Sequence, residues 1–140
     1  MSPQHPTKAM EEAHKRILRE RAHRAITRKN VEFILEHQND RLFALTMYLK
    51  QCQQELGHPP ARTEIIGGDY IEMRFGTWEK ALLSIGVRNG AQIDRATPWP
   101  EKTKLFQDEL ALQMELDRRE KLERKRANKE RIERKKQEQK

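Results

Sequence analysis

The placement of turn residues and large apolar residues constrains the fold more than any other feature. Both kinds gather between Leu42 and Val87, whereas the chain on either side is highly charged and rich in helix-forming residues. Charged residues make up 36% of the sequence, against about 25% in a typical domain, which argues against one core running through the whole chain. The sequence therefore predicts an all-α protein: a small helix-turn-helix-like module with a basic N-terminal helix and a long charged C-terminal helix.

Composition divides the chain into four segments. We expect a basic N-terminal helical arm over residues 1–41, the helical module over 42–87, a Pro/Trp linker over 88–100 and the charged helix over 101–140. In the arm, Asn30 is a candidate N-cap for a further apolar segment that docks on the module. In the linker, Trp99 lies between two prolines. We expect it to pin the linker onto the module; an exposed anchor for a partner is the alternative.

Within the module, the apolar residues recur at helical spacing. A first helix carries them at intervals of three, four, three and four, and it must end at Gly57 because His58 precedes Pro59. Its apolar residues are Leu42, Leu45, Leu49, Cys52 and Leu56.

Further along, we expect Asp69 to cap a short helix that turns Tyr70 and Met73 inward, with Ile71 as a further inward candidate. Its outward candidates are Tyr70, Glu72 and Arg74. Thr77 can cap the next helix, and Gly86 can close it. Trp78 and the apolar residues after it follow the helical spacing that a core-forming helix requires.

Three pieces of this stretch resemble a known family. They are Glu55-Leu56-Gly57-His58-Pro59-Pro60, then Arg74-Phe75-Gly76-Thr77-Trp78-Glu79-Lys80-Ala81-Leu82, then Ile85-Gly86-Val87. In order and spacing they are similar to the homing-endonuclease-associated repeat, also called the HNH-associated repeat, over about residues 42–87. The resemblance implies a small all-α unit that accompanies nucleases and other DNA-handling proteins, without implying a nuclease here. The residues that carry the structural motif are Gly57, Pro59, Phe75, Gly76, Trp78 and Leu82.

The last forty residues contain neither glycine nor proline, so they predict one helix of about 60 Å. Its first half carries an apolar stripe, Leu105–Leu116, whereas its second half is too poor in apolar residues for a coiled-coil seam. Such a helix is expected to fray, or to order on a polyanion.

The net charge of +7 comes mainly from the chain after Leu116, which holds twelve Lys/Arg against six Asp/Glu. Basic runs suit polyanions such as nucleic acid, but alternating charges also form ordinary solvated helix faces. In the module, Arg62, Arg74 and Lys80 are weaker candidates, because Asp69 and Glu72 lie near them. The candidate nucleic-acid-binding residues of the tail are Arg118, Arg119, Lys121, Arg124, Lys125, Arg126, Lys129, Arg131, Arg134, Lys135 and Lys136.

Signals for catalysis and metal binding are missing from the sequence. Cys52 is the only cysteine, and no two of the five histidines stand at metal-binding spacing. The chain carries no His-Asn-His nuclease pattern and no glycine-rich phosphate loop. We therefore expect no enzyme activity, no cofactor and no metal. Met1–Lys8 lacks the apolar stretch of a signal peptide, and no run reaches ~20 apolar residues, so we expect a cytoplasmic protein without a membrane segment.

The favoured function from these observations is non-catalytic nucleic-acid binding. The basic helices would supply mostly phosphate contacts, with DNA as the favoured partner. One alternative is a factor that binds the ribosome or another structured RNA. The other is a protein-interaction adaptor that uses the stripe Leu105–Leu116.

Overall fold

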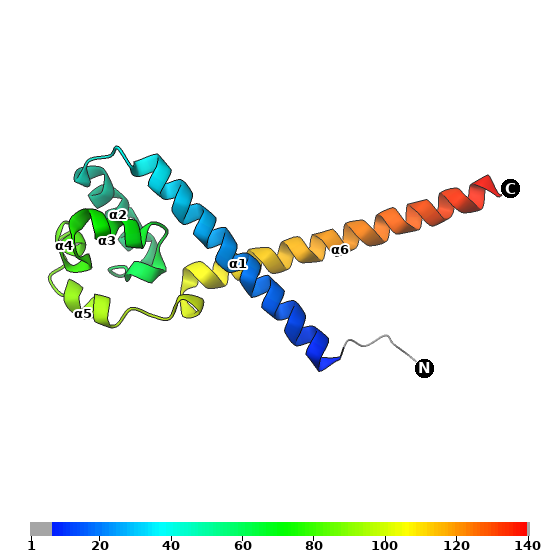
Figure 1. Cartoon of the computed structure of the whole chain (residues 1–140), viewed down its shortest axis with the longest axis horizontal. Helices are drawn as coiled ribbons and strands as arrows, with labels where there is room; N and C mark the ends of the chain where they lie inside the picture. The colour runs from blue at the N-terminus through cyan, green and yellow to red at the C-terminus, as the bar shows by residue number, and fades with distance from the viewer. Residues whose placement is uncertain (1–6, 140) are drawn as a thin grey trace. The chain divides into compact units, whose positions relative to one another are not determined.

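The computed structural model describes residues 7–139, so the first six residues of the predicted arm and Lys140 lie outside it. It is 80% helical, with no strand in the described part of the chain, which confirms the all-α class. Six α-helices and two short 3-10 helices follow one another (Figure 1). Their bounds are α1 Lys8–His37, α2 Leu42–Leu56, η1 Arg62–Glu64, α3 Gly68–Phe75, α4 Trp78–Leu83, α5 Gly90–Arg95, η2 Pro100–Lys102 and α6 Lys104–Glu138.

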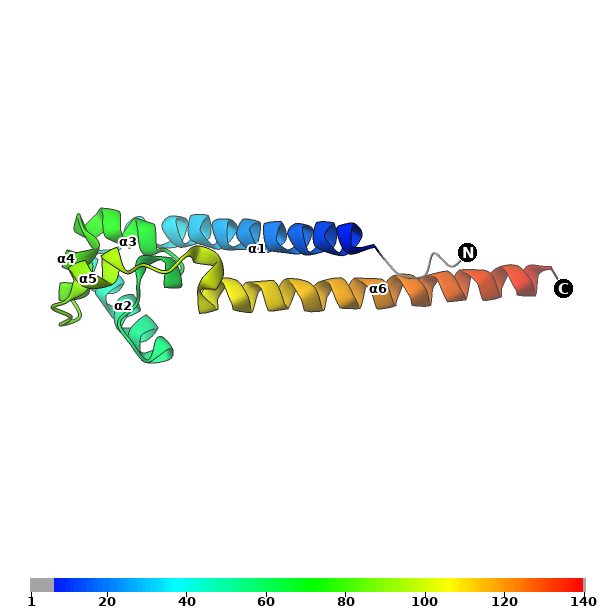
Figure 2. The same cartoon turned by 90° about the horizontal axis from the view of Figure 1, so that it is seen from below.

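The chain forms two compact units. The first covers residues 22–109 and holds α2 to α5 with the adjoining parts of α1 and α6. The second consists of residues up to 21 together with residues from 110 onward. In this second unit His14 Nε2 lies 3.0 Å from Asp117 Oδ2, and Leu18 is buried. Within this unit, Figures 1 and 2 both show the last turns of α6 extending beyond the turns of α1 that belong to it.

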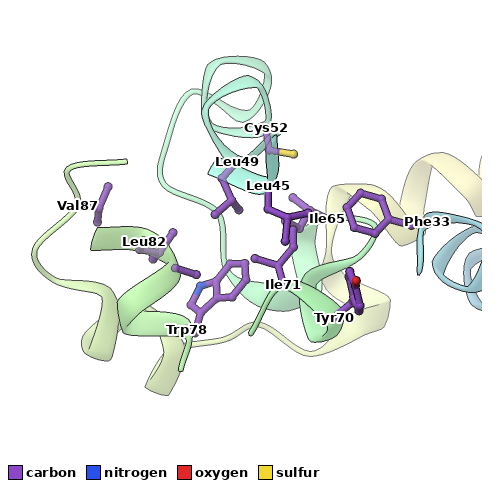
Figure 3. Packing of buried hydrophobic residues seen from close by; sticks show 11 residues of the cluster. Phe33, Leu45, Leu49, Cys52, Ile65, Tyr70, Ile71, Trp78, Leu82 and Val87 are labelled. Atoms are coloured by element: carbon purple, nitrogen blue, oxygen red, sulfur yellow. The ribbon is translucent and has the colours of Figure 1, made fainter. Parts of the chain in front are cut away.

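The core of the first unit is built from the apolar faces that the sequence predicts. Leu45 and Leu49 of α2 and Ile71 of α3 are fully buried beside Trp78 and Leu82 of α4 (Figure 3). Trp78 Nε1 donates a hydrogen bond to the carbonyl oxygen of Pro60 at 3.1 Å, which satisfies its one buried polar group. Figure 3 shows Cys52 on α2 in the same cluster, as expected for a small core residue.

The two ends of α4 are formed as the sequence predicts. Thr77 Oγ1 accepts a hydrogen bond from the backbone N–H of Lys80 at 3.1 Å. At the other end Gly86 has φ 83°, a conformation that favours glycine. The N–H of Val87 donates to Leu82 O and that of Gly86 donates to Leu83 O, both at 3.0 Å. These two bonds are the pair that closes a Schellman C-cap.

The structure corrects the role of Asn30. No break interrupts α1 at this position, and no glycine or proline lies within the helix. Asn30 instead lies inside α1, and its Oδ1 accepts a hydrogen bond from the N–H of Gly67 at 2.7 Å. Phe33, one turn further along α1, is buried in the module's core. The second half of α1 is therefore part of the packed unit.

Helix α3 also differs from the expectation. It begins at Gly68 after Gly67, which has φ 80°, so Asp69 lies in the first turn and is not the cap. This start places Ile71 on the inner face, where it is fully buried, and leaves Met73 65% exposed. Tyr70, a candidate for both the inner and the outer face, points into the core and is 9% exposed, so its outward placement is wrong.

The predicted linker contains a helix. Helix α5 begins at Gly90, which is buried against α4: a Cβ added there would lie 2.9 Å from the Cα of Glu79. Because glycine has no side chain, it permits this close packing of α5 against α4. Trp99 does not pin the segment, because its side chain is 69% exposed.

Candidate nucleic-acid interface

Helix α6 carries the basic tail, and opposite charges one turn apart support its first part. Asp117 lies 3.2 Å from Lys121, and Glu120 lies 3.9 Å from Arg124. Glu115 pairs with Arg118 at 2.7 Å. Such pairs stabilise a solvated helix weakly, by a few tenths of a kcal/mol each.

The first tail cations are held by carboxylates of the same helix. The hydrogen bond from Arg118 lowers the pKa of Glu115, and the same contact raises the pKa of Arg118. For Asp117, burial acts to raise the pKa, but hydrogen bonds from Lys121 and His14 outweigh it and lower the pKa. Arg119 also contacts Glu115, at 3.2 Å. These cations therefore already have an anionic partner.

The cations further along the tail are different. All side chains from 118 to 139 are exposed. Arg131 donates to Asn128 Oδ1 at 2.9 Å, but no cation after Arg124 pairs with a carboxylate in the described part of the chain. We call the following residues the free tail cations: Lys125, Arg126, Lys129, Arg134, Lys135 and Lys136.

Helix geometry gathers three of the free tail cations on one face. At 100° per residue, Lys125, Lys129 and Lys136 fall within an arc of about 40°. They extend along about 16 Å of helix, whereas Glu130 and Glu133 lie outside this arc. A row of exposed ammonium groups of this kind can contact successive phosphates without reading sequence.

Two of the module's three candidates, Arg62 and Arg74, contact partners within the first unit. Arg62 pairs with Glu72 at 3.0 Å and with Asp69 at 3.4 Å. Its local positive charge is therefore largely compensated. Lys80 is exposed on α4.

The sequence predicted that Arg74 points outward, and this prediction is wrong. Its guanidinium donates to His37 O at 3.3 Å, to Asp40 O at 2.5 Å and to Tyr70 Oη at 2.7 Å. These contacts join α3 to the loop between α1 and α2. The structure therefore gives Arg74 a structural role in its own unit, while the tail cations belong to the other unit.

The difference between paired and free tail cations was not recognised from the sequence, although a signal is present. Arg119, Lys121 and Arg124 each follow an acidic residue by four positions. In contrast, Lys125 follows Lys121 and Lys129 follows Lys125 by the same interval. Because residues four apart are neighbours on a helix, this spacing favours pairing of the first three cations with a preceding carboxylate and offers none to Lys125 and Lys129.

Within residues 7–139 no three His, Cys, Asp or Glu side chains are arranged to hold a metal ion. The helices described here include none that is both long and apolar enough to cross a membrane.

The fold thus defines an all-α protein in which a packed helical unit is joined to a helix carrying exposed cations. Residues 44–88 match the family model described as the homing endonuclease associated repeat, which confirms the resemblance seen in the motifs. The match covers α2 from Ala44 onward, then η1, α3 and α4. Comparison with curated proteins finds no match, and neither does comparison with solved structures.

Proposed function

We propose that this chain is a non-catalytic nucleic-acid-binding protein whose main contacts are phosphate contacts from α6, with DNA as the favoured partner. The observation that carries the proposal is the set of free tail cations, which are exposed and have no carboxylate partner within residues 7–139. An unpaired cation gains electrostatic stabilisation when it contacts a phosphate, whereas a paired cation already has this stabilisation from its carboxylate. The homing endonuclease associated repeat in residues 44–88 supports DNA as the partner through the family's name alone.

The division of α6 into paired and free cations gives a matched test. One variant replaces four free tail cations, Lys125, Arg126, Lys129 and Lys136, with glutamine. Its control replaces four paired cations, Arg118, Arg119, Lys121 and Arg124, with glutamine. Both variants lose four charges from the same helix, and glutamine has nearly the helix propensity of lysine and arginine.

Binding to duplex DNA is then measured by fluorescence anisotropy over a salt series. Each lost phosphate contact lowers the slope of log K against log salt by about 0.9, so the first variant should lower it by about 3 to 4. The control should lower it by clearly less, because its residues have intramolecular partners. Equal effects of the two variants would mean that only net charge matters, and a wild-type chain that binds no nucleic acid would refute the proposal.

Structured RNA is the alternative nucleic acid, and the same titration with an RNA hairpin distinguishes it. Tighter binding of the hairpin than of the duplex DNA at equal salt would assign the tail to RNA.

A second candidate function is protein binding through α6. Leu112, Met114 and Leu116 are 46%, 54% and 40% exposed, which is unusual for a stripe of apolar side chains on a solvated helix. Partner binding that is insensitive to salt and is lost when Leu112 and Leu116 become glutamine would favour this function over the first.

A further inference from the structure

Trp99 is an exposed aromatic side chain on a fixed turn. It lies between α5 and α6, and 69% of it is exposed, whereas the chain's other tryptophan, Trp78, is 1% exposed. A tryptophan that is this accessible leaves most of its apolar surface in water, although burying it would be favourable.

The backbone around Trp99 is held on both sides. Thr63 Oγ1 donates to Pro98 O at 3.0 Å, and the N–H of Lys102 donates to Trp99 O at 2.9 Å. Thr103 Oγ1 donates to Pro100 O at 2.7 Å. The two prolines restrict the backbone further. The turn therefore presents the indole with little backbone entropy left to lose on binding.

Exposed cations precede and follow Trp99 along the chain. Arg88, Arg95 and Lys102 are exposed, and none of them forms an ion pair within residues 7–139. The nearby carboxylate of Glu101 contacts His23 Nε2 at 2.9 Å. Among the charged residues from Arg88 to Lys102, the three cations are exposed, whereas Asp94 and Glu101 are partly buried.

Trp99 is separated along the chain from the other exposed apolar side chains. Between Leu83 and Leu112 along the described chain, it is the only large hydrophobic side chain that is exposed. An anchor in a protein interface normally lies within a well-packed patch that excludes water. An exposed tryptophan with exposed cations before and after it in the sequence instead has the composition of surfaces on which bases of single-stranded nucleic acids stack.

We propose that Trp99 stacks on an unpaired base, so that this turn binds a single-stranded segment of nucleic acid. The inference rests on the proposed function, because it specifies which form of nucleic acid the first unit contacts. It adds a site that is independent of the free tail cations, since an indole carries no charge and its loss leaves the salt dependence of binding unchanged.

The test uses the full chain and its own fluorescence. Emission is excited at 295 nm, so it comes from the two tryptophans, and Trp78 is shielded in the core. The chain is titrated with a single-stranded oligothymidine and with a fully paired duplex of equal length. We expect the oligothymidine to quench the Trp99 emission and the duplex to leave it nearly unchanged. Circular dichroism verifies that each variant is folded.

Three variants complete the experiment. Trp99→Ala should bind the oligothymidine at least about five-fold more weakly with the same salt slope. Trp99→Phe should retain most of the affinity, because phenylalanine also stacks. Met73→Ala, which truncates a side chain of similar exposure at 65%, should bind as the wild type does.

The outcomes separate this inference from the proposed function. Oligothymidine binding that is unaffected by Trp99→Ala, or that leaves Trp99 emission unchanged, would overturn the stacking site while the nucleic-acid function stands. A chain that binds neither oligonucleotide would overturn both. Binding of a protein with the same loss in Trp99→Ala, but no nucleic-acid binding, would assign the turn to a protein partner.

Discussion

Replacing Arg74 with glutamine distinguishes a structural role from a nucleic-acid contact at this position. The guanidinium donates three hydrogen bonds: to the carbonyl oxygen of His37 at the end of α1, to that of Asp40 in the following loop, and to Tyr70 Oη. It also lies 5.6 Å from the centroid of the Tyr70 ring. Hydrogen bonds from a charged donor contribute about 1.5–3 kcal/mol, and an exposed cation–π contact about 0.5–1 kcal/mol. Because water can reach the loop and replace part of this, we expect the free energy of unfolding to fall by about 2 kcal/mol.

Urea denaturation followed by circular dichroism at 222 nm measures this change, with Lys80→Gln as the control. Lys80 is exposed, and its capping bond uses its backbone N–H, so the control should remain within about 0.5 kcal/mol of the wild type. The reasoning would be refuted if Arg74→Gln unfolded at the wild-type urea concentration and lowered the salt slope of DNA binding by about one unit, since Arg74 would then be a phosphate ligand.

Three further predictions concern the first unit. Phe33→Ala should lower the free energy of unfolding by about 3–5 kcal/mol, because Phe33 is 6% exposed in the core. Leu35 lies on the same helix and is 61% exposed, so Leu35→Ala should have little effect in the same urea titration. Thr77→Ala should cost about 1 kcal/mol through loss of the α4 cap, whereas Thr77→Ser should be nearly neutral. Burial raises the pKa of the Cys52 thiol, so at pH 8 a thiol reagent should react far more slowly with the native chain than with the urea-unfolded chain; equal rates would contradict the burial of Cys52.

The sequence predicted the helices of the module well because its signals are local. Thr77 and Gly86 define the ends of α4 through backbone geometry that extends over a few residues. The apolar spacing of α2 likewise identified Leu45, Leu49 and Cys52 as its buried face. Each of these features depends on residues within one or two turns.

Where the prediction was wrong, the deciding contacts join residues distant in sequence. Asn30 was expected to start a helix, but it accepts a hydrogen bond from Gly67, which is 37 residues away. Arg74 was expected to point outward, but its partners His37 and Asp40 lie more than thirty residues before it. The packing of Gly90 against Glu79 depends on how α5 meets α4. Periodicity and capping rules do not contain such information.

The residues of the candidate site were predictable from the sequence, but the pairing of its cations was not. The basic run of α6 is evident from the sequence, and the structure leaves the predicted tail residues exposed. Which cations are already paired depends on side-chain geometry: Arg134 follows Glu130 by four residues, yet the two form no ion pair in the described chain. The exposure of Trp99 was not predicted, because a tryptophan between prolines can either pack or protrude.

Binding of the full-length chain to duplex DNA, single-stranded DNA and an RNA hairpin across a salt series tests the central claim most directly. We predict binding with a steep negative slope of log K against log salt, because the free tail cations replace counterions on the phosphates. The nucleic acid bound most tightly at equal salt then identifies the partner. The absence of binding to all three at about 50 mM salt, where phosphate contacts are strong, would contradict the account.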